Sequence, residues 1–174
     1  MTRFSERLLI GSIGFALGTV LAFQVVQGQE TYPLDGPLNQ VGIVVRDIET
    51  SSRVFGDVFG VEVPPPIISR GIPVPPGRGD AVEVKRTEFT RNNVTIELVE
   101  PVGGASPWRE HLEAHGEGVH HLAFTVDDVG AAVAFLEDRG GDWVLGARGV
   151  DFAYVDLTPE LGFTIELLGP SLAP

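Results

Sequence analysis

Four polar side chains stand at places in this sequence where they could hold a metal ion. Gln40 and His121 each open an apolar, strand-like segment, and Glu97 and Glu166 each lie inside another one. An ionised carboxylate inside an apolar strand is costly unless it is paired or bound to a cation. Two carboxylates, one imidazole and one amide oxygen form a donor set suited to Zn²⁺, Ni²⁺, Co²⁺, Fe²⁺ or Mn²⁺. These residue types therefore predict a site for a divalent metal.

The segments that carry these residues are repeated along the chain. The run QVGIVVRDI at 40–48 matches HLAFTVDDV at 121–129, and each run is followed by a helical pattern. The run VTIELVEP at 94–101 likewise matches FTIELLGP at 163–170. This internal duplication predicts two modules of about residues 38–101 and 119–170, each made of a strand, a helix and three strands. Gln40 and His121 then occupy equivalent positions, as do Glu97 and Glu166.

Strand alternation predicts where the two carboxylates point. The apolar neighbours of each glutamate should face the helices, which would turn Glu97 and Glu166 into a shared cleft. An alternative keeps the four residues apart, with Gln40 at a strand edge, His121 as a core histidine and each glutamate bonded to a local amide. The equivalence of all four positions in a repeat favours the metal site.

Helix and turn signals place the remaining elements. The segment from Val63 to Asp80 is rich in proline, so we expect a long surface loop there rather than a helix or a central strand. Arg70 and Arg78 in that loop are either solvated or close to a substrate carboxylate or phosphate. Strands are expected at 40–45, 82–90, 94–99, 119–126, near 143, at 152–157 and at 163–168, and helices after Asp47, after Ser106 and after Asp127 or Asp128.

The remaining histidines are given structural roles. His120 should lie on the opposite strand face from His121 and be packed. His111 and His115 fall on or beside a short surface helix and are expected to be solvated.

The N-terminal residues differ from the rest of the chain. Arg3 and Arg7 precede an uncharged apolar run from Leu8 to Val26. This pattern predicts a signal peptide or an uncleaved anchor over residues 1–28, followed by a linker at 29–37 and the folded domain at 38–170. The domain would then be exported, in the periplasm or another extracytoplasmic space, and would touch the membrane only through its N-terminal segment.

Composition excludes several kinds of function. The chain has 174 residues and a formal net charge of −12, which argues against binding to nucleic acid. It contains no cysteine, so disulfides, thiolate zinc sites and a cysteine nucleophile are all excluded.

From about Leu38 to Pro170 the chain resembles the vicinal oxygen chelate superfamily, which includes glyoxalase I, methylmalonyl-CoA epimerase, extradiol dioxygenases and antibiotic-resistance proteins. The resemblance rests on QVGIVV from Gln40, IELVEP from Ile96 and GEGVHHLAF from Gly116, which are especially similar to the epimerase branch. It implies an α+β fold in which two βαβββ modules form a concave, curved mixed sheet. It also implies metal ligands at Gln40, Glu97, His121 and Glu166.

Some positions depart from the epimerase pattern. Epimerases usually have histidine where this chain has Gln40, and the order Gln, Glu, His, Glu resembles zinc-type glyoxalase I instead. Their second acid falls roughly where this chain has Lys85, with Glu83 two residues away. Export also fits poorly with coenzyme A thioesters, which are handled mainly in the cytosol.

The resemblance implies a metal-dependent lyase or isomerase that moves a proton next to a chelated carbonyl. Its substrate would be a small molecule with adjacent oxygens, with Glu166 as the base and Glu97 as the next candidate. Two alternatives remain: a resistance-type protein that binds a small molecule without turnover, and a dioxygenase, which needs two histidines and one glutamate as ligands. A homodimer is expected by analogy.

Overall fold

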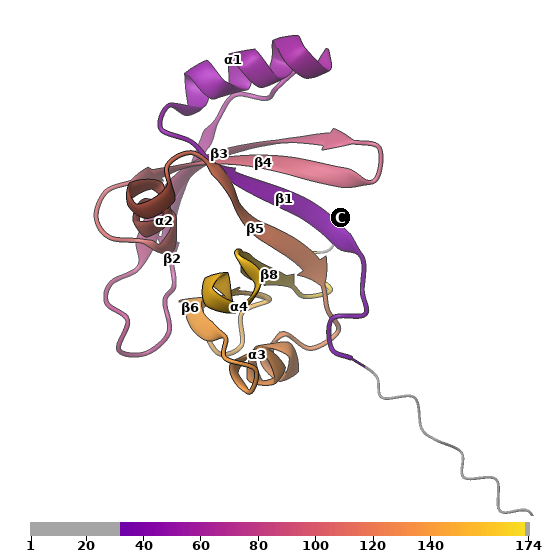
Figure 1. Ribbon diagram of the computed structural model, residues 1–174, viewed down its shortest axis with the longest axis vertical. Coiled ribbons are helices and arrows are strands. Elements are labelled where there is room, and N and C mark those ends of the chain that lie inside the picture. Colours follow the sequence, from indigo (N-terminus) through magenta and orange to yellow (C-terminus); the bar gives the residue numbers. More distant parts are fainter. Residues whose placement is uncertain (1–31, 173–174) are drawn as a thin grey trace, which may run out of the picture. The chain divides into compact units, whose positions relative to one another are not determined.

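Eight strands form one mixed sheet in the order β2-β3-β4-β1-β5-β8-β7-β6 (Figure 1). The computed structural model describes residues 32–172. The strands are β1 Leu38–Val44, β2 Ile67–Ile72, β3 Val82–Arg91, β4 Val94–Val102, β5 Gly118–Thr125, β6 Asp142–Gly146, β7 Phe152–Asp156 and β8 Thr164–Leu168. The helices are α1 Ile48–Phe59, α2 Pro107–His115, α3 Val129–Glu137 and α4 Thr158–Leu161.

The strand order is symmetric about the centre of the sheet. β1 runs parallel to β4 and β5 runs parallel to β8, while β1 and β5 pair antiparallel with each other. Each half therefore contains a strand, a helix and three strands. The predicted α+β fold of two βαβββ modules in a concave mixed sheet is confirmed, with the curled sheet forming a half-barrel.

The two modules begin their helices in the same way. The Asp47 side chain accepts a hydrogen bond from the backbone N–H of Thr50 at 2.9 Å, and Asp128 does the same for Ala131 at 2.9 Å. α1 packs on β3 and β4, and α3 packs on β6, β7 and β8, so each helix covers the outer face of its own module (Figure 1). As alternation predicted, Leu98 contributes to the core beside α1 and Leu167 to the core beside α3.

The proline-rich segment was predicted as a loop, and this was wrong over Ile67–Ile72, which forms β2. The six residues of β2 contain no proline, and among residues 32–172 β2 is an edge strand that pairs only with β3. Proline excludes a central strand because it lacks a backbone N–H, but prolines that flank a segment leave an edge position open to it. The register shifts between Ser69 and Ile72, where Gly71 adopts a φ of 69°.

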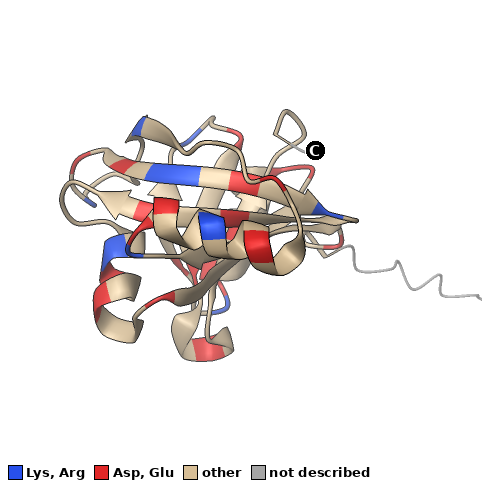
Figure 2. Ribbon diagram, turned by 90° about the horizontal axis from the view of Figure 1, so that it is seen from above, with Lys and Arg blue, Asp and Glu red and all other residues tan. Residues whose placement is uncertain are grey.

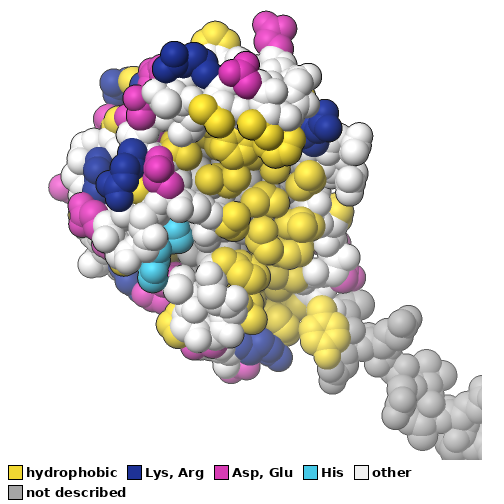
Figure 3. Space-filling view, turned by 45° about the horizontal axis from the view of Figure 1, so that its top comes forward, with side chains coloured by type: hydrophobic (Ala, Val, Ile, Leu, Met, Phe, Trp, Pro, Cys, Tyr) yellow, Lys and Arg dark blue, Asp and Glu magenta, His cyan; other side chains and the backbone are white. Residues whose placement is uncertain are grey.

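The surface carries both charged and apolar groups. Acidic and basic residues are interspersed over several elements (Figure 2). One face also shows a band of apolar side chains (Figure 3), and α1 contributes exposed apolar residues at Val54, Val58 and Phe59. The expected homodimer stays a prediction.

Candidate metal centre

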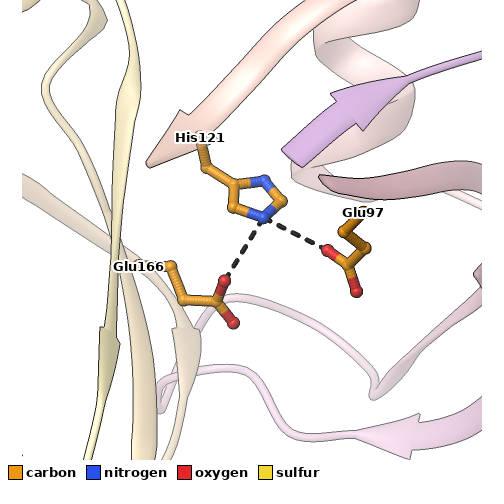
Figure 4. A group of neighbouring side chains, drawn as sticks. All are labelled: Glu97, His121 and Glu166. Atoms are coloured by element: carbon orange, nitrogen blue, oxygen red, sulfur yellow. Dashed lines mark ion pairs between the residues drawn. The ribbon is translucent and has the colours of Figure 1, made fainter. Parts of the chain in front are cut away.

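The four predicted ligands meet on the concave side of the sheet, one from each of its four central strands. The Nε2 atom of His121 lies 3.2 Å from a carboxylate oxygen of Glu97 and 3.2 Å from one of Glu166 (Figure 4). The amide nitrogen of Gln40 lies 3.0 Å from the same oxygen of Glu97 and 3.3 Å from that of Glu166. The structure therefore brings together residues that are up to 126 positions apart in the sequence.

Gly42 makes room for the His121 ring. It is the cross-strand partner of Glu97 on one side and of His121 on the other. Side chains of paired residues lie on the same face of a sheet, so a side chain at position 42 would compete with both. A Cβ atom added at Gly42 would overlap the imidazole of His121. The glycine thus allows the imidazole to lie over β1, between the two carboxylates.

A β-bulge places a second imidazole behind His121. The register between β1 and β5 shifts beside Gly42, which leaves His120 as an extra residue on β5. The Nδ1 atoms of His120 and His121 lie 3.1 Å apart, and His120 is 3% exposed. His120 is packed as predicted, but the prediction that it lies on the opposite strand face from His121 was wrong, because the bulge brings both rings to the same side, against Tyr154. The contact between the two Nδ1 atoms fixes the ring of His121 with Nε2 toward the carboxylates.

The charged groups of this centre are almost completely buried. The exposed fractions are 5% for Glu97, 7% for Glu166 and 0% for His121. Burial on its own lowers the pKa of His121, but the hydrogen bonds and charges of Glu166 and Glu97 outweigh it and raise the pKa to about 9. The imidazolium then balances only one of the two carboxylates.

These residues fit a divalent cation. The candidate ligand atoms of Glu97, His121 and Glu166 all lie within 4.8 Å of one another. With His121 neutral, a doubly charged ion would balance both carboxylates, and buried charges require such compensation. Gln40 could offer its amide oxygen after a half-turn of the amide, since the nitrogen and oxygen ends are interchangeable in shape.

A cavity of about 370 Å³ opens in front of the centre and is lined by three of the predicted ligands, Gln40, Glu97 and Glu166. Three further lining residues were missed by the sequence reasoning: Arg86, Glu88 and Tyr154.

Cross-strand pairing explains why two of these missed residues reach the cavity. Glu88 is the partner of Glu97 on β4, and Tyr154 is the partner of Glu166 on β8. Alternation places Glu88 and Tyr154 each on one face of its strand, but only the register against β4 and β8 shows that this is the face of the glutamates.

Tyr154 is a neutral group beside the carboxylates. Burial, followed by the negative charges of Glu166 and Glu97, raises the pKa of its phenol well above the usual value. The phenol therefore stays protonated and keeps an O–H donor on this side of the cavity.

Other predicted candidates do not line this cavity. Lys85 points to the outer face of the sheet, where it pairs with Glu49 of α1 and lies 3.8 Å from Glu100. Glu83 pairs with Arg70 at 3.4 Å. The position predicted for a second acid is thus turned away from the centre.

The two arginines of the predicted loop, Arg70 on β2 and Arg78, are exposed at the surface. Arg78 pairs with Asp142 on β6, and the Arg70 side chain is 63% exposed. Neither lines the 370 Å³ cavity, so the expectation of contact with a substrate finds no support there.

Comparisons with known proteins give consistent results. The family model described as Glyoxalase/Bleomycin resistance protein/Dioxygenase superfamily matches residues 39–154. The chain is 30% identical over 139 residues to the ethylmalonyl-CoA/methylmalonyl-CoA epimerase of Cereibacter sphaeroides, covering 76% of this chain and 96% of that protein. It is 32% identical over 127 residues to the mitochondrial methylmalonyl-CoA epimerase of Mus musculus, covering 71% of this chain and 66% of that protein. The chain thus spans nearly all of the bacterial relative but slightly under two thirds of the mouse one.

Solved structures show the same fold. The structure of methylmalonyl-CoA epimerase from Mycobacterium tuberculosis superposes with a TM-score of 0.57 at 24% identity, over 85% of this chain and 95% of that one. A methylmalonyl-CoA epimerase in complex with methylmalonyl-CoA and NH4+ superposes with a TM-score of 0.57 at 22% identity, over 80% and 99% of the two chains.

These comparisons contradict the predicted export to the periplasm. The mouse relative is a mitochondrial protein by name, and the same holds for a human relative that is 30% identical over 105 residues. Among residues 32–172, every helix is too short or too polar to cross a bilayer. The signal peptide or anchor was placed on residues 1–28, which lie outside the described residues. The prediction rested on two arginines, an apolar run and Gly28 at a cleavage-like spacing, and these local features were not enough to identify the route of transport.

Proposed function

Because this chain belongs to the glyoxalase/bleomycin resistance protein/dioxygenase superfamily, we propose that it is an isomerase that epimerises the carbon next to the carbonyl of a small acyl-CoA thioester. Gln40, Glu97, His121 and Glu166 would hold a divalent cation. The observation that carries the proposal is the meeting of two buried carboxylates from opposite modules around one imidazole, at the wall of a cavity.

The two glutamates would move the proton. Glu166 would accept the proton from the carbon next to the carbonyl, and the electron pair of the broken C–H bond would pass to the carbonyl oxygen. Glu97 comes from the other module; protonated beforehand from water, it would donate that proton to the opposite face of the same carbon, which inverts its configuration, and Glu166 would then release its proton to water.

When bound, the cation would supply Lewis-acid polarisation of that carbonyl, which makes the neighbouring C–H more acidic. Tyr154 would keep an O–H donor beside Glu166 and so would help to hold that carboxylate in place. A glutamate that both binds the cation and moves a proton must loosen one of these contacts during turnover.

A glyoxalase I-like reaction is the second candidate, and Gln40 is the residue that favours it. The ligand order Gln, Glu, His, Glu is similar to that of zinc-type glyoxalase I, whereas the bacterial and mouse relatives compared above are epimerases. A dioxygenase is less well supported, because His121 is the one histidine in the three-residue cluster among residues 32–172.

Proton exchange tests the proposal. The full chain, loaded in turn with Zn²⁺, Ni²⁺, Co²⁺, Fe²⁺ or Mn²⁺, would be mixed with methylmalonyl-CoA in D₂O, and deuterium at the carbon between the carbonyls would be followed by mass spectrometry. We expect exchange above the solvent rate with wild type and with Glu137→Gln, an exposed control on α3, and a loss of at least about 100-fold in Glu166→Gln.

Wild-type exchange at only the solvent rate with every ion would refute the epimerase. Full exchange in Glu166→Gln would refute the role of that residue. A hemithioacetal substrate in the same assay distinguishes the glyoxalase-like reaction from epimerisation, because a glyoxalase-like enzyme would catalyse exchange in the hemithioacetal. Tight binding of a substrate without any exchange would indicate a resistance-type binding protein.

A further inference from the structure

Arg86 faces the cavity of the metal centre but belongs to none of the predicted ligand positions. It lies on β3 between Val84 and Glu88, and all three line the 370 Å³ cavity. Its side chain is 34% exposed. An arginine in this position is half withdrawn from water and still accessible to a molecule in the cavity.

The guanidinium of Arg86 is held from three directions. Its Nε donates to the hydroxyl of Ser69 on β2 at 3.1 Å, and its Nη1 pairs with Glu88 and lies 3.4 Å from Glu97. Among residues 32–172, the Nη2 group has no hydrogen-bonding partner. Since guanidinium carries five N–H donors in a rigid fork, donors remain for a planar anion.

Glu97 links Arg86 to the metal centre. One of its oxygens, Oε2, faces His121 and Gln40, while the other, Oε1, faces Arg86. The carboxylate of Glu97 therefore lies between the guanidinium and the position that a cation would take. A small ligand held at the centre would have its neighbouring groups close to Arg86.

In the described part of the chain, the ion pair between Arg86 and Glu88 is the one in the cavity that a ligand could replace. A divalent cation would balance Glu97 and Glu166, so Arg86 and Glu88 remain as a neutral pair on β3. The Glu88 side chain is 39% exposed, so it can turn toward water and release the guanidinium. Exposed ion pairs of this kind contribute little to stability and exchange easily.

We propose that Arg86 binds the free carboxylate of the acyl group of the substrate, with Glu88 occupying the guanidinium until the substrate arrives. This inference rests on the proposed function, because it assumes an acyl thioester in the cavity. It deepens the proposed function by assigning the residue that would recognise the carboxylate of that thioester. The cavity accommodates an acyl group of a few carbons, while the coenzyme A portion would extend outside. Arginine suits this task because its fork matches a carboxylate in two parallel hydrogen bonds.

A binding experiment tests the inference without requiring turnover. Dissociation constants of malonyl-CoA and acetyl-CoA, which differ only in the carboxylate, would be measured by calorimetry on the full chain loaded with metal. In Arg86→Gln we expect malonyl-CoA to bind about 10- to 100-fold more weakly and acetyl-CoA to change less than about twofold. Arg53→Gln, on the exposed surface of α1, should change neither.

Two further variants separate recognition from a structural role. Glu88→Gln removes the internal competitor, so malonyl-CoA should bind as well as in wild type or a few-fold more tightly. Arg86→Lys keeps the charge but loses the fork, so the loss for malonyl-CoA should be intermediate. Arg86→Gln could fail to fold, which its melting curve and metal content would show. In that case the malonyl-CoA dissociation constants of Arg86→Lys and Glu88→Gln test the role of Arg86 instead.

The outcomes distinguish this inference from the proposed function. Equal effects of Arg86→Gln on both thioesters, or no effect on either, would overturn the role of Arg86 even if deuterium exchange is catalysed. If Arg86→Lys has to replace Arg86→Gln in the experiment, unchanged binding of malonyl-CoA to Arg86→Lys would overturn the role of Arg86. Selective loss of malonyl-CoA binding in a protein that catalyses no exchange would support Arg86 and refute the epimerase.

Discussion

The two modules share one backbone plan but differ in the residue placed opposite their glutamate. In the first module that residue is Glu88, which is charged, paired with Arg86 and 39% exposed. In the second it is Tyr154, which is neutral and 5% exposed and packs edge-on against Trp108, with ring centres 5.7 Å apart. The second module therefore forms a rigid support for the centre, and the first presents exchangeable charges to the cavity. The two modules can have these different roles because equivalent positions such as Glu88 and Tyr154 carry unrelated side chains on the same backbone arrangement.

The largest expected effect on metal binding concerns the contact between the modules at Gly42. Gly42→Ala should lower metal affinity at least about 100-fold and destabilise the protein by about 1–3 kcal/mol, because the added Cβ overlaps the His121 ring. Gly118→Ala is the matched control, since Gly118 lies in the same strand pair, opposite Val44, and an added Cβ would meet nothing within 4 Å. Metal titration and urea unfolding measure both effects. Equal behaviour of the two variants would show that Gly42 is not needed for the placement of His121.

Substitutions of Glu88 and Tyr154 should have very different effects on the unfolding free energy. Tyr154→Ala should cost about 3–5 kcal/mol of unfolding free energy, because it removes a large buried side chain. Glu88→Ala should change it by less than about 0.5 kcal/mol, as for other partly exposed polar residues. Urea denaturation of the metal-free protein measures both. If Glu88→Ala lowers the unfolding free energy as much as Tyr154→Ala does, the contrast between a first module with exchangeable charges and a rigid second module is wrong.

A metal-free protein should show a pH dependence that comes from His121. Its pKa is raised from 6.5 to about 9, so its contribution to stability is full below about pH 6.5, declines as the pH rises and is gone beyond about pH 9. We expect a loss of a few kcal/mol of unfolding free energy between pH 6 and pH 9.5. The variant His121→Asn should lack most of this loss. An identical pH profile in that variant would assign the effect to other groups.

The residues that precede the two strand-opening ligands also differ. His120 bonds to His121, whereas Asn39, which precedes Gln40, bonds to Thr125 and not to a candidate ligand. His120→Ala should weaken metal binding about 10- to 100-fold, as loss of a group that orients a ligand does, and His120→Asn should restore part of it. Asn39→Ala should change metal affinity by less than about threefold. Competition with a coloured chelator measures these affinities, and a larger effect at Asn39 would reverse the assignment of support to the second module.

The repeat explains how much of the molecule could be predicted from its sequence. Matching Gln40 with His121 and Glu97 with Glu166 predicted both the fold and the four residues that meet. Arg86, Glu88 and Tyr154 were missed because their strands lack obvious likeness between the modules, and strand pairing, which aligns Glu88 with Glu97, is a long-range property. The bulge at His120 depends on the register of β5 against β1 and leaves no mark in the sequence.

The most direct test of the metal centre is elemental analysis of the purified full chain, compared with Glu166→Ala and His121→Ala after incubation with each candidate ion and dialysis against a weak chelator. The structure predicts about one divalent transition-metal ion per chain in wild type and a loss in both variants, because each removes a buried ligand. Equal and negligible metal in all three proteins, with folding intact, would contradict the centre.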